Sequence, residues 1–305
     1  MYKYMSINTF ITGKNSSIFG NGSMKLTPTI ATINYTNAVK TTADGNTIYT
    51  FTNTSSTGTF SVSGNVNAHI LIIGGGGAGG SDGGGGGGAG GLLDIASVPL
   101  TTKTYNINIG IGALGSNASY SALSNGSNTT FDTLYTAYGG CGGYPLHSKI
   151  TTINTGGSGG GASCQVDGGV PGPGLGTPGQ GYNGGPSGSP SYNAGAGGGG
   201  ATQIGYINSD WVGGAGGNGY TSNISGTTQI YAGGGGGGCW NGTGGEGGLG
   251  GGGVGGGAQY GQPPPGSGSY YGAGGGGNGY GTFTAGSGYQ GIVIISIPTA
   301  NIVNP

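Results

Sequence analysis

Glycine fills much of the chain from the run at residues 74–77 to roughly residue 288, and it limits what this region can fold into. Of 305 residues, 86 are glycine. Glycine has no Cβ and permits close backbone approach, but it loses more chain entropy on ordering than any other residue. An ordinary helical or sheet core of glycine would therefore be costly. Two outcomes remain: a flexible low-complexity tract, or extended polyproline II-type helices packed backbone against backbone.

Composition favours the packed helices over the flexible tract. Disordered chains are typically rich in charge and poor in aromatic residues, whereas charged residues here are 4% and tyrosines number 19. Collagen needs glycine at each third position, a period that this chain does not show. Uninterrupted runs at residues 83–88, 233–238 and 274–277 put glycine on all three sides of such a helix. We therefore predict a glycine-helix bundle in which neighbours surround each helix, aided by weak Cα–H···O contacts.

The residues that flank the glycine region have β-type composition. Residues 29–39, 47–52 and 58–63 read as strands, with a turn at Asp44-Gly45-Asn46. Apolar runs at residues 69–73 and 291–297 bracket the glycine region, and we expect them to share one sheet. Residues 105–111 and 129–138 predict two further strands. The predicted fold is all-β with a polyproline II-type bundle and little or no α-helix. Its parts are an N-terminal β unit at residues 1–68, a glycine-rich domain at 69–298 and a tail at 299–305.

Charge and hydropathy weigh against several classes of partner. The net charge is −1, and all six basic residues are lysines, so neither nucleic acid nor an anionic membrane is an expected partner. No run approaches the roughly 20 apolar residues of a membrane-crossing helix. The first residues, MYKYMSIN, lack the apolar core of a secretory signal peptide.

Few residues are suited to catalysis or to metal binding. The three cysteines Cys141, Cys164 and Cys239 lie far apart, and we interpret them as small packing residues, with one bridge between two of them left open. His147 lies close to Cys141 alone among them, which disfavours a zinc site. A hydrolase that uses His147 as its base is the alternative from another class, but no nucleophile motif accompanies this histidine. We expect no enzyme activity, no metal and no cofactor.

Aromatic residues near turns are the main candidates for recognition. Trp211, Trp240, Tyr270 and Tyr271 interrupt the glycine region. Aromatic side chains on a rigid scaffold make good contacts to sugars and protein surfaces. The alternative is that they cap the ends of the bundle. The residues alone support both interpretations equally.

Several stretches resemble the glycine-rich domain found in bacteriophage tail-fibre proteins and giant-virus virion proteins. The likeness spans roughly residues 46–298, although that family usually has a basic residue late in the last strand, where this chain has Ser296. The stretches that carry it are Thr50-Phe51-Thr52, Gly58-Thr59-Phe60-Ser61-Val62, Ile70-Leu71-Ile72-Ile73 with the four glycines that follow, residues 86–91, 105–111 and 176–181, and Gly291-Ile292-Val293-Ile294-Ile295. The resemblance implies a β base with a glycine-helix bundle.

The resemblance also implies a place in a virus particle. The expected function is that of a non-enzymatic virion structural protein, at the surface or in a fibre of a giant virus or phage. The alternative is a receptor-binding adhesin at a tail-fibre tip, since loops of some phage relatives contact the host receptor. Residues 1–45 fall outside the likeness and are the natural segment for binding other virion proteins. A host glycan or protein and a second copy of the chain are the other partners considered.

Overall fold

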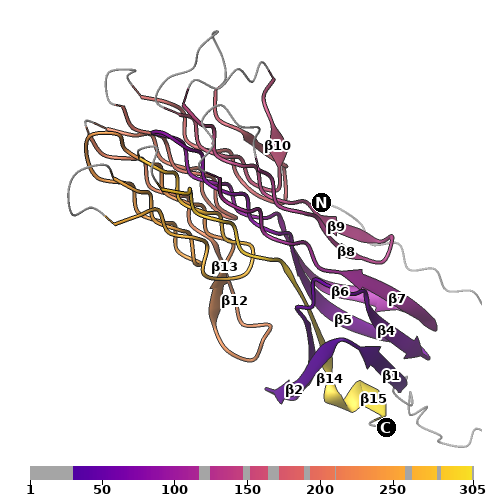
Figure 1. The fold of residues 1–305 in the computed structure, drawn as a ribbon. Helices are drawn as coiled ribbons and strands as arrows, with labels where there is room; N and C mark the ends of the chain where they lie inside the picture. The colour runs from indigo at the N-terminus through magenta and orange to yellow at the C-terminus, as the bar shows by residue number, and fades with distance from the viewer. Residues whose placement is uncertain are drawn as a thin grey trace, which may run out of the picture.

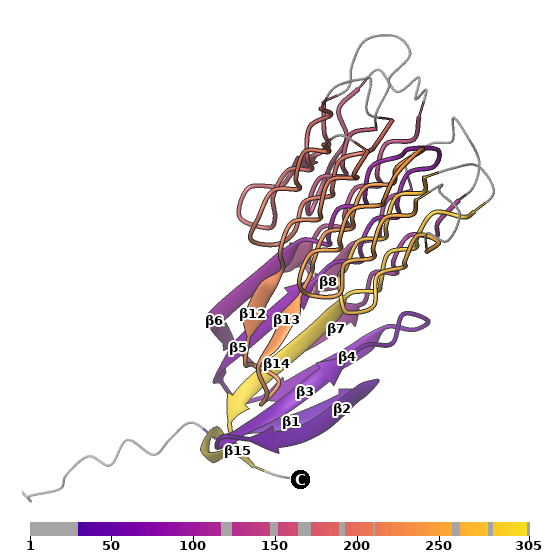
Figure 2. The same ribbon diagram turned by 90° about the vertical axis from the view of Figure 1, so that its left-hand side faces the viewer.

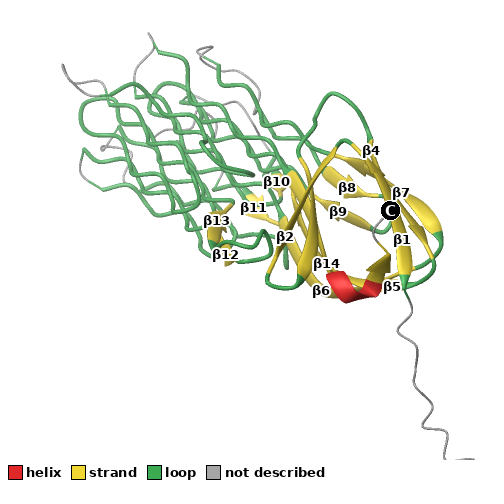
Figure 3. Cartoon of the chain, turned by 90° about the horizontal axis from the view of Figure 1, so that it is seen from below, coloured by secondary structure: helices red, strands yellow, loops and turns green. Residues whose placement is uncertain are grey.

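The structure is a computed structural model that describes residues 30–116, 124–146, 152–163, 172–188, 193–209, 211–257, 263–279 and 283–303. The molecule is elongated, with a β base at one end and a bundle of extended glycine-rich segments at the other (Figures 1 and 2). Within the described ranges the one helix is the short 3-10 helix η2 (Thr299–Asn301). The predicted all-β class with little or no α-helix is confirmed (Figure 3).

Fifteen strands appear in chain order among the described residues. Their bounds are β1 Ala31–Thr36, β2 Ala38–Ala43, β3 Asn46–Phe51, β4 Gly58–Ser63, β5 Val66–Ile73, β6 Leu92–Leu100, β7 Lys103–Asn108, β8 Thr129–Phe131, β9 Tyr135–Ala137, β10 Thr155–Gly156, β11 Leu175–Gly176, β12 Tyr220–Ser222, β13 Gln229–Tyr231, β14 Ile292–Pro298 and β15 Ile302–Val303.

Two sheets form the base and enclose its core. One sheet has the strand order β15-β1-β4-β7-β8-β9 and the other β2-β3-β14-β5-β6. The buried core cluster draws on strands of both sheets and includes Tyr49, Phe51, Phe60, Ile70 and Ile295. Alternation along β4, whose burial switches at every residue, turns one side of each strand toward this core.

The two apolar strands that bracket the glycine region are paired, as predicted. β14 runs antiparallel to β5, with Ile292 opposite Ile73 and Ser296 opposite His69. The region between them therefore begins and ends at the same edge of the base. β3, from the expected N-terminal unit, also pairs with β14, from the expected glycine-rich domain. The boundary expected at residue 68 therefore divides one sheet.

Other strand predictions need correction. The expected strand at residues 29–39 is two strands in different sheets, because the backbone turns at Asn37, whose φ is 59°. The Asn37 side chain holds this corner by donating to Ser56 Oγ at 3.1 Å and to the Thr57 carbonyl at 3.0 Å. The expected strand at 129–138 is the hairpin β8–β9. The predicted turn at Asp44-Gly45 is confirmed, with both residues at positive φ.

Backbone hydrogen bonds show how the glycine segments pack. Along residues 74–80 the N–H groups donate to three different segments in rotation. Residues 74, 77 and 80 bond to carbonyls of 91, 88 and 85; residues 75 and 78 bond to 127 and 124; residues 76 and 79 bond to 289 and 286. Three residues per turn is the period of the polyproline II helix. The bonding supports the expected helix type for these segments.

Residues 85–91 run through the interior of the bundle. Their N–H groups donate to three surrounding segments, and their carbonyls accept from three more. The six neighbours are residues 74–80, 138–144, 158–161, 196–199, 235 and 272–275. A helix that is surrounded in this way has no side left for side chains, which explains why this stretch is almost pure glycine.

The bundle meets the base through a second apolar cluster. Sheet residues such as Leu71 and Ile294 contact Ala89, Ile224 and Tyr231 of the bundle. The hairpin β12–β13 belongs to this contact and extends back over the five-stranded sheet (Figure 2).

Candidate functional site

The four aromatic residues predicted as recognition residues do not form one site. Strand β13 marks the base end of the bundle (Figure 1), and residues 232–239 run from it along the bundle. Trp211 and Trp240 belong to the far end of this run. Tyr270 and Tyr271 instead pack against the apolar cluster that joins base and bundle. The candidate set is therefore divided between the two ends of the bundle.

Trp211 lies at the edge of an open groove of about 520 Å³, which Asn241, Gly242 and Thr243 also line. The Trp211 side chain is 49% exposed, and its backbone has a φ of 60°. The Trp211 carbonyl accepts a hydrogen bond from the Thr243 N–H at 3.0 Å, which ties the two loops together. A Cβ at Gly242 would lie 1.8 Å from the same carbonyl oxygen, so glycine is required for this approach. The groove thus presents one large exposed aromatic side chain, on a backbone that the Thr243 hydrogen bond and the close approach of Gly242 hold in place.

Trp240 is more enclosed than Trp211. Its backbone N–H donates to the Asn193 carbonyl at 2.7 Å, and its residue is only partly exposed. This bond fixes the loop that leaves the buried Cys239. The partial burial of Trp240 favours the capping interpretation for this residue more than for Trp211.

Tyr270 and Tyr271 belong to a row of packed tyrosines. Ring centroids are 5.4 Å apart between Tyr231 and Tyr270, 5.1 Å between Tyr270 and Tyr271, and 5.6 Å between Tyr271 and Tyr289. Burial raises the pKa of both Tyr270 and Tyr271 above the ordinary value for tyrosine. For these two residues the structure favours the capping interpretation, because their rings fill the seam between bundle and base.

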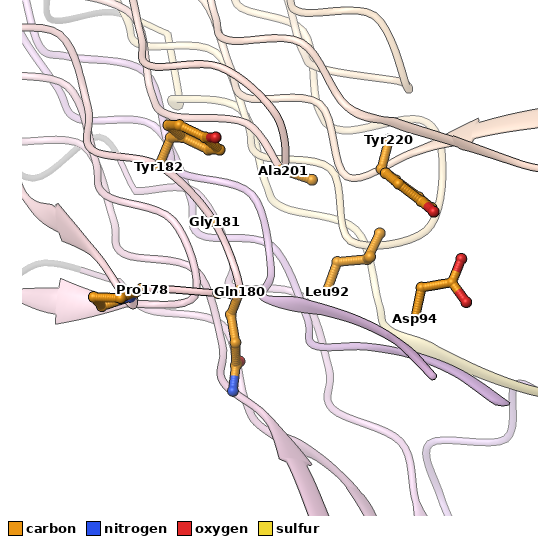
Figure 4. Close-up of a pocket in the computed structure, with 9 residues that line it drawn as sticks. Leu92, Asp94, Pro178, Gln180, Gly181, Tyr182, Ala201 and Tyr220 are labelled. Carbon is orange, nitrogen blue, oxygen red and sulfur yellow. The ribbon is translucent and has the colours of Figure 1, made fainter. Parts of the chain in front are cut away.

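A polar cluster at this junction was not singled out as a site from the sequence. His69 Nε2 is hydrogen-bonded to Asp94 Oδ1 across neighbouring strands β5 and β6. A hydrogen bond with Asp94 is the main cause that raises the pKa of Tyr220, with burial second. Asp94 and Tyr220 line two hollows of about 540 and 370 Å³. Figure 4 shows the larger one, with Leu92, Tyr182 and Ala201 around it.

This cluster was not predicted from the sequence because its members are far apart in the chain. His69 and Asp94 meet only through the pairing of β5 with β6, and Tyr220 arrives on the β12–β13 hairpin. The irregularity in β5–β6 pairing between Ala68 and Ile70 lies at His69 itself. No short motif carries such an arrangement, so only the pairing of the strands reveals it.

The thiols are buried and free. Cys141 and Cys239 are both inaccessible and unbridged, which agrees with their interpretation as packing residues. Burial raises the pKa of Cys141 to about 12 and also raises that of Cys239. At neutral pH the nucleophilic thiolate is therefore scarce at both positions. Cys164 and His147 lie outside the described residues.

The chain matches a glycine-rich domain family, and its described residues show neither a metal cluster nor a membrane-crossing helix. In the described ranges no three His, Cys, Asp or Glu side chains come together as a metal site would need. No helix in the same ranges has the length and apolar character that crossing a membrane requires. A family model described as a glycine-rich domain matches residues 52–298. No curated protein matches the chain.

Proposed function

We propose a function from one premise: the chain belongs to the glycine-rich domain family, whose model covers both apolar bracket strands and everything between them. The proposed function is that of a non-enzymatic structural protein of a virus particle, at its surface or in a fibre of a giant virus or phage. Residues 1–45 would bind other virion proteins, and the far end of the bundle would face outward toward the host.

The separation of the two ends of the molecule carries this proposal. The described chain starts and finishes in the base, where β1 pairs with β15 and Ala31 lies opposite Ile302. The Trp211 groove lies at the opposite end of the bundle, past residues 232–239. A molecule attached through one end and exposed at the other needs such an arrangement. Figures 1 and 2 show the base and the bundle at opposite ends of the molecule.

The bonding of the bundle supports a structural role. Interior segments such as residues 85–91 are bonded to several neighbours at once, so no single segment can move without breaking contacts to others. Cys141 and Cys239 are inaccessible, and charged residues are 4% of the chain, so the described surface carries few reactive groups. Such a scaffold suits a protein that must persist outside a cell.

Purified particles test this proposal directly. Particles from the source of the sequence would be banded on a density gradient, treated with a protease while intact, and analysed by mass spectrometry. We expect peptides of this chain in the particle band, with bundle-tip peptides lost first on protease treatment. Absence of the chain from banded particles would refute a structural role in the virion.

A second candidate function is receptor binding at a tail-fibre tip. The exposed Trp211 in its fixed groove favours it, because aromatic residues dominate the energetics of many recognition surfaces. The purified chain should then block attachment of particles to host cells, and Trp211→Ala should lose this effect. Tyr182→Ala is the matched control, since Tyr182 is similarly exposed at 47% but lies at the junction hollow. Equal blocking by both variants would exclude the groove as the receptor site.

A further inference from the structure

Residues 243–249 form a segment at the lateral surface of the bundle, with solvent on one side. Its sequence is Thr-Gly-Gly-Glu-Gly-Gly-Leu. Its backbone bonds reach three neighbouring segments, at residues 213–219, 234–237 and 252–255. With three residues per turn, successive side-chain positions point to three sides.

Two of these sides are closed to any side chain. A Cβ at Gly245 or Gly248 would lie 2.2 or 2.0 Å from a carbonyl oxygen of residues 214–217. A Cβ at Gly244 or Gly247 would lie 1.9 or 2.0 Å from a carbonyl oxygen of residues 252–255. Glycine is required at these positions because the neighbouring backbones occupy the space of a side chain.

The third side faces solvent and carries every side chain of the segment. Thr243, Glu246 and Leu249 are exposed, three residues apart, and Leu249 is 61% exposed. Glu246 is the one glutamate of the whole chain and sits in the middle of this row. We call these three residues the outer row.

Similar rows occur on other outer segments. Ile111 and Leu114 are exposed three residues apart, and so are Ile204 and Ile207, although Tyr206 between the latter two is exposed as well. Interior stretches such as residues 84–88 have glycine at every position. Exposed side chains at a spacing of three therefore occur on segments with an open side, whereas segments surrounded by neighbours carry nothing larger than an occasional alanine such as Ala89.

An outer segment with an open side but no such row would allow a further glycine segment to bond there. A glycine helix bonds to neighbours through groups on every side, much as an unpaired β-strand edge offers its backbone to another strand. Glycine segments of one chain are chemically the same as those of another. The same contacts that build the bundle could thus join two molecules, unless a Cβ holds their backbones apart.

We propose that the outer row closes this face of the bundle against a second copy of the chain. The Cβ atoms keep an approaching backbone from the close distance that glycine helices need, and the Glu246 charge resists desolvation at such a contact. The row thereby keeps the bundle a single molecule on this face. This role does not depend on whether the chain belongs to a virus particle.

Two triple variants of the full chain test the proposal. Thr243→Gly/Glu246→Gly/Leu249→Gly removes the row, while Thr243→Ser/Glu246→Ser/Leu249→Ser removes the same charge and apolar bulk but keeps each Cβ. We expect the weight-average mass of the glycine variant in sedimentation to rise with concentration toward twice that of the wild type. The serine variant should sediment like the wild type. A simple hydrophobic-patch account predicts no gain for either, because both lose Leu249.

Further measurements keep the test decisive. Hydrogen exchange on the bundle amides shows whether the glycine variant is folded. If it is not, Ile111→Gly/Leu114→Gly, with its serine counterpart, applies the same test to a different row. Wild-type sedimentation of a folded glycine variant would overturn the proposal. Equal association of glycine and serine variants would overturn the role of the Cβ atoms, and Glu246→Gln would then show whether charge alone closes the face.

Discussion

Replacing Gly86 by alanine should destabilise the bundle more than most single substitutions do. The new Cβ would lie 2.0 Å from the carbonyl oxygen of Gly235 and 2.5 Å from its carbonyl carbon. Ordinary contact begins at 3.4 Å, so the oxygen would have to move by about 1.4 Å. The atom in the way is backbone of a packed segment, which cannot rotate aside as a side chain could.

The hydrogen bonds around the site set the size of the effect. Gly86 N–H donates to Ala196 at 2.9 Å, Gly161 N–H donates to Gly86 at 2.8 Å, and Gly235 N–H donates to Gly87 at 2.9 Å. Overpacking a filled interior costs about 1–3 kcal/mol. Loss of two of these bonds would add about 2 kcal/mol at roughly 1 kcal/mol each. The free energy of unfolding should therefore fall by about 4 kcal/mol.

Urea denaturation followed by circular dichroism measures this change, and Gly172→Ala provides the control. A Cβ at Gly172 would meet nothing within 4 Å, and Gly172 is not among the glycines at positive φ. That variant should equal the wild type or gain up to about 1 kcal/mol, because alanine restricts the unfolded chain. A Gly86→Ala protein within about 1 kcal/mol of the wild type would refute the packing argument.

Three further predictions concern charge, thiol reactivity and the aromatic residues. Hydrogen bonding to Lys103 lowers the pKa of Asp132. The pair therefore stabilises the fold above the usual aspartate pKa and loses that contribution as pH falls through the lowered value. In Asp132→Asn the free energy of unfolding, measured from neutral to acidic pH, should lose this part of its pH dependence. Burial raises the pKa of Cys141 to about 12, so iodoacetamide at pH 8 should leave it unmodified in the native protein and label it in urea, as read by peptide mass spectrometry; native labelling would contradict its burial. Tyr270→Ala should lower the free energy of unfolding by about 2–4 kcal/mol without changing attachment blocking. Trp211→Ala should reduce attachment blocking without changing the free energy of unfolding. A loss of stability in Trp211→Ala but not in Tyr270→Ala would contradict the assignment of Tyr270 to packing and of Trp211 to recognition.

Much of the architecture follows from local properties of the sequence. Uninterrupted glycine excludes ordinary cores. The runs at residues 70–73 and 292–295 are buried strands because apolar side chains point to both faces of each strand. The Asp44-Gly45 turn is also local, since the two-residue hairpin requires positive φ that these residues tolerate. Such features depend on residues that are neighbours in the chain.

The spacing of three between exposed side chains on the outer segments was not predicted from the sequence. No single period extends over the whole glycine region, because interior segments are almost entirely glycine and the outer segments differ from one another, with Gly-Gly between the exposed residues of 243–249 but Gly-Ala between Ile111 and Leu114. The signal is present in Thr243, Glu246 and Leu249, but it is short and each outer segment has its own phase. A search segment by segment would have found it.

What only the tertiary structure decided is which segments lie beside one another. Trp211 and Tyr270 are both aromatic residues that interrupt the glycine region, yet one is exposed at a groove and the other packs in the seam between base and bundle. His69, Asp94 and Tyr220 meet only through strand pairing and a returning hairpin. Glycine has no side chain to specify its neighbour, so composition predicts that the segments pack, whereas the order in which they lie side by side is seen only in the fold.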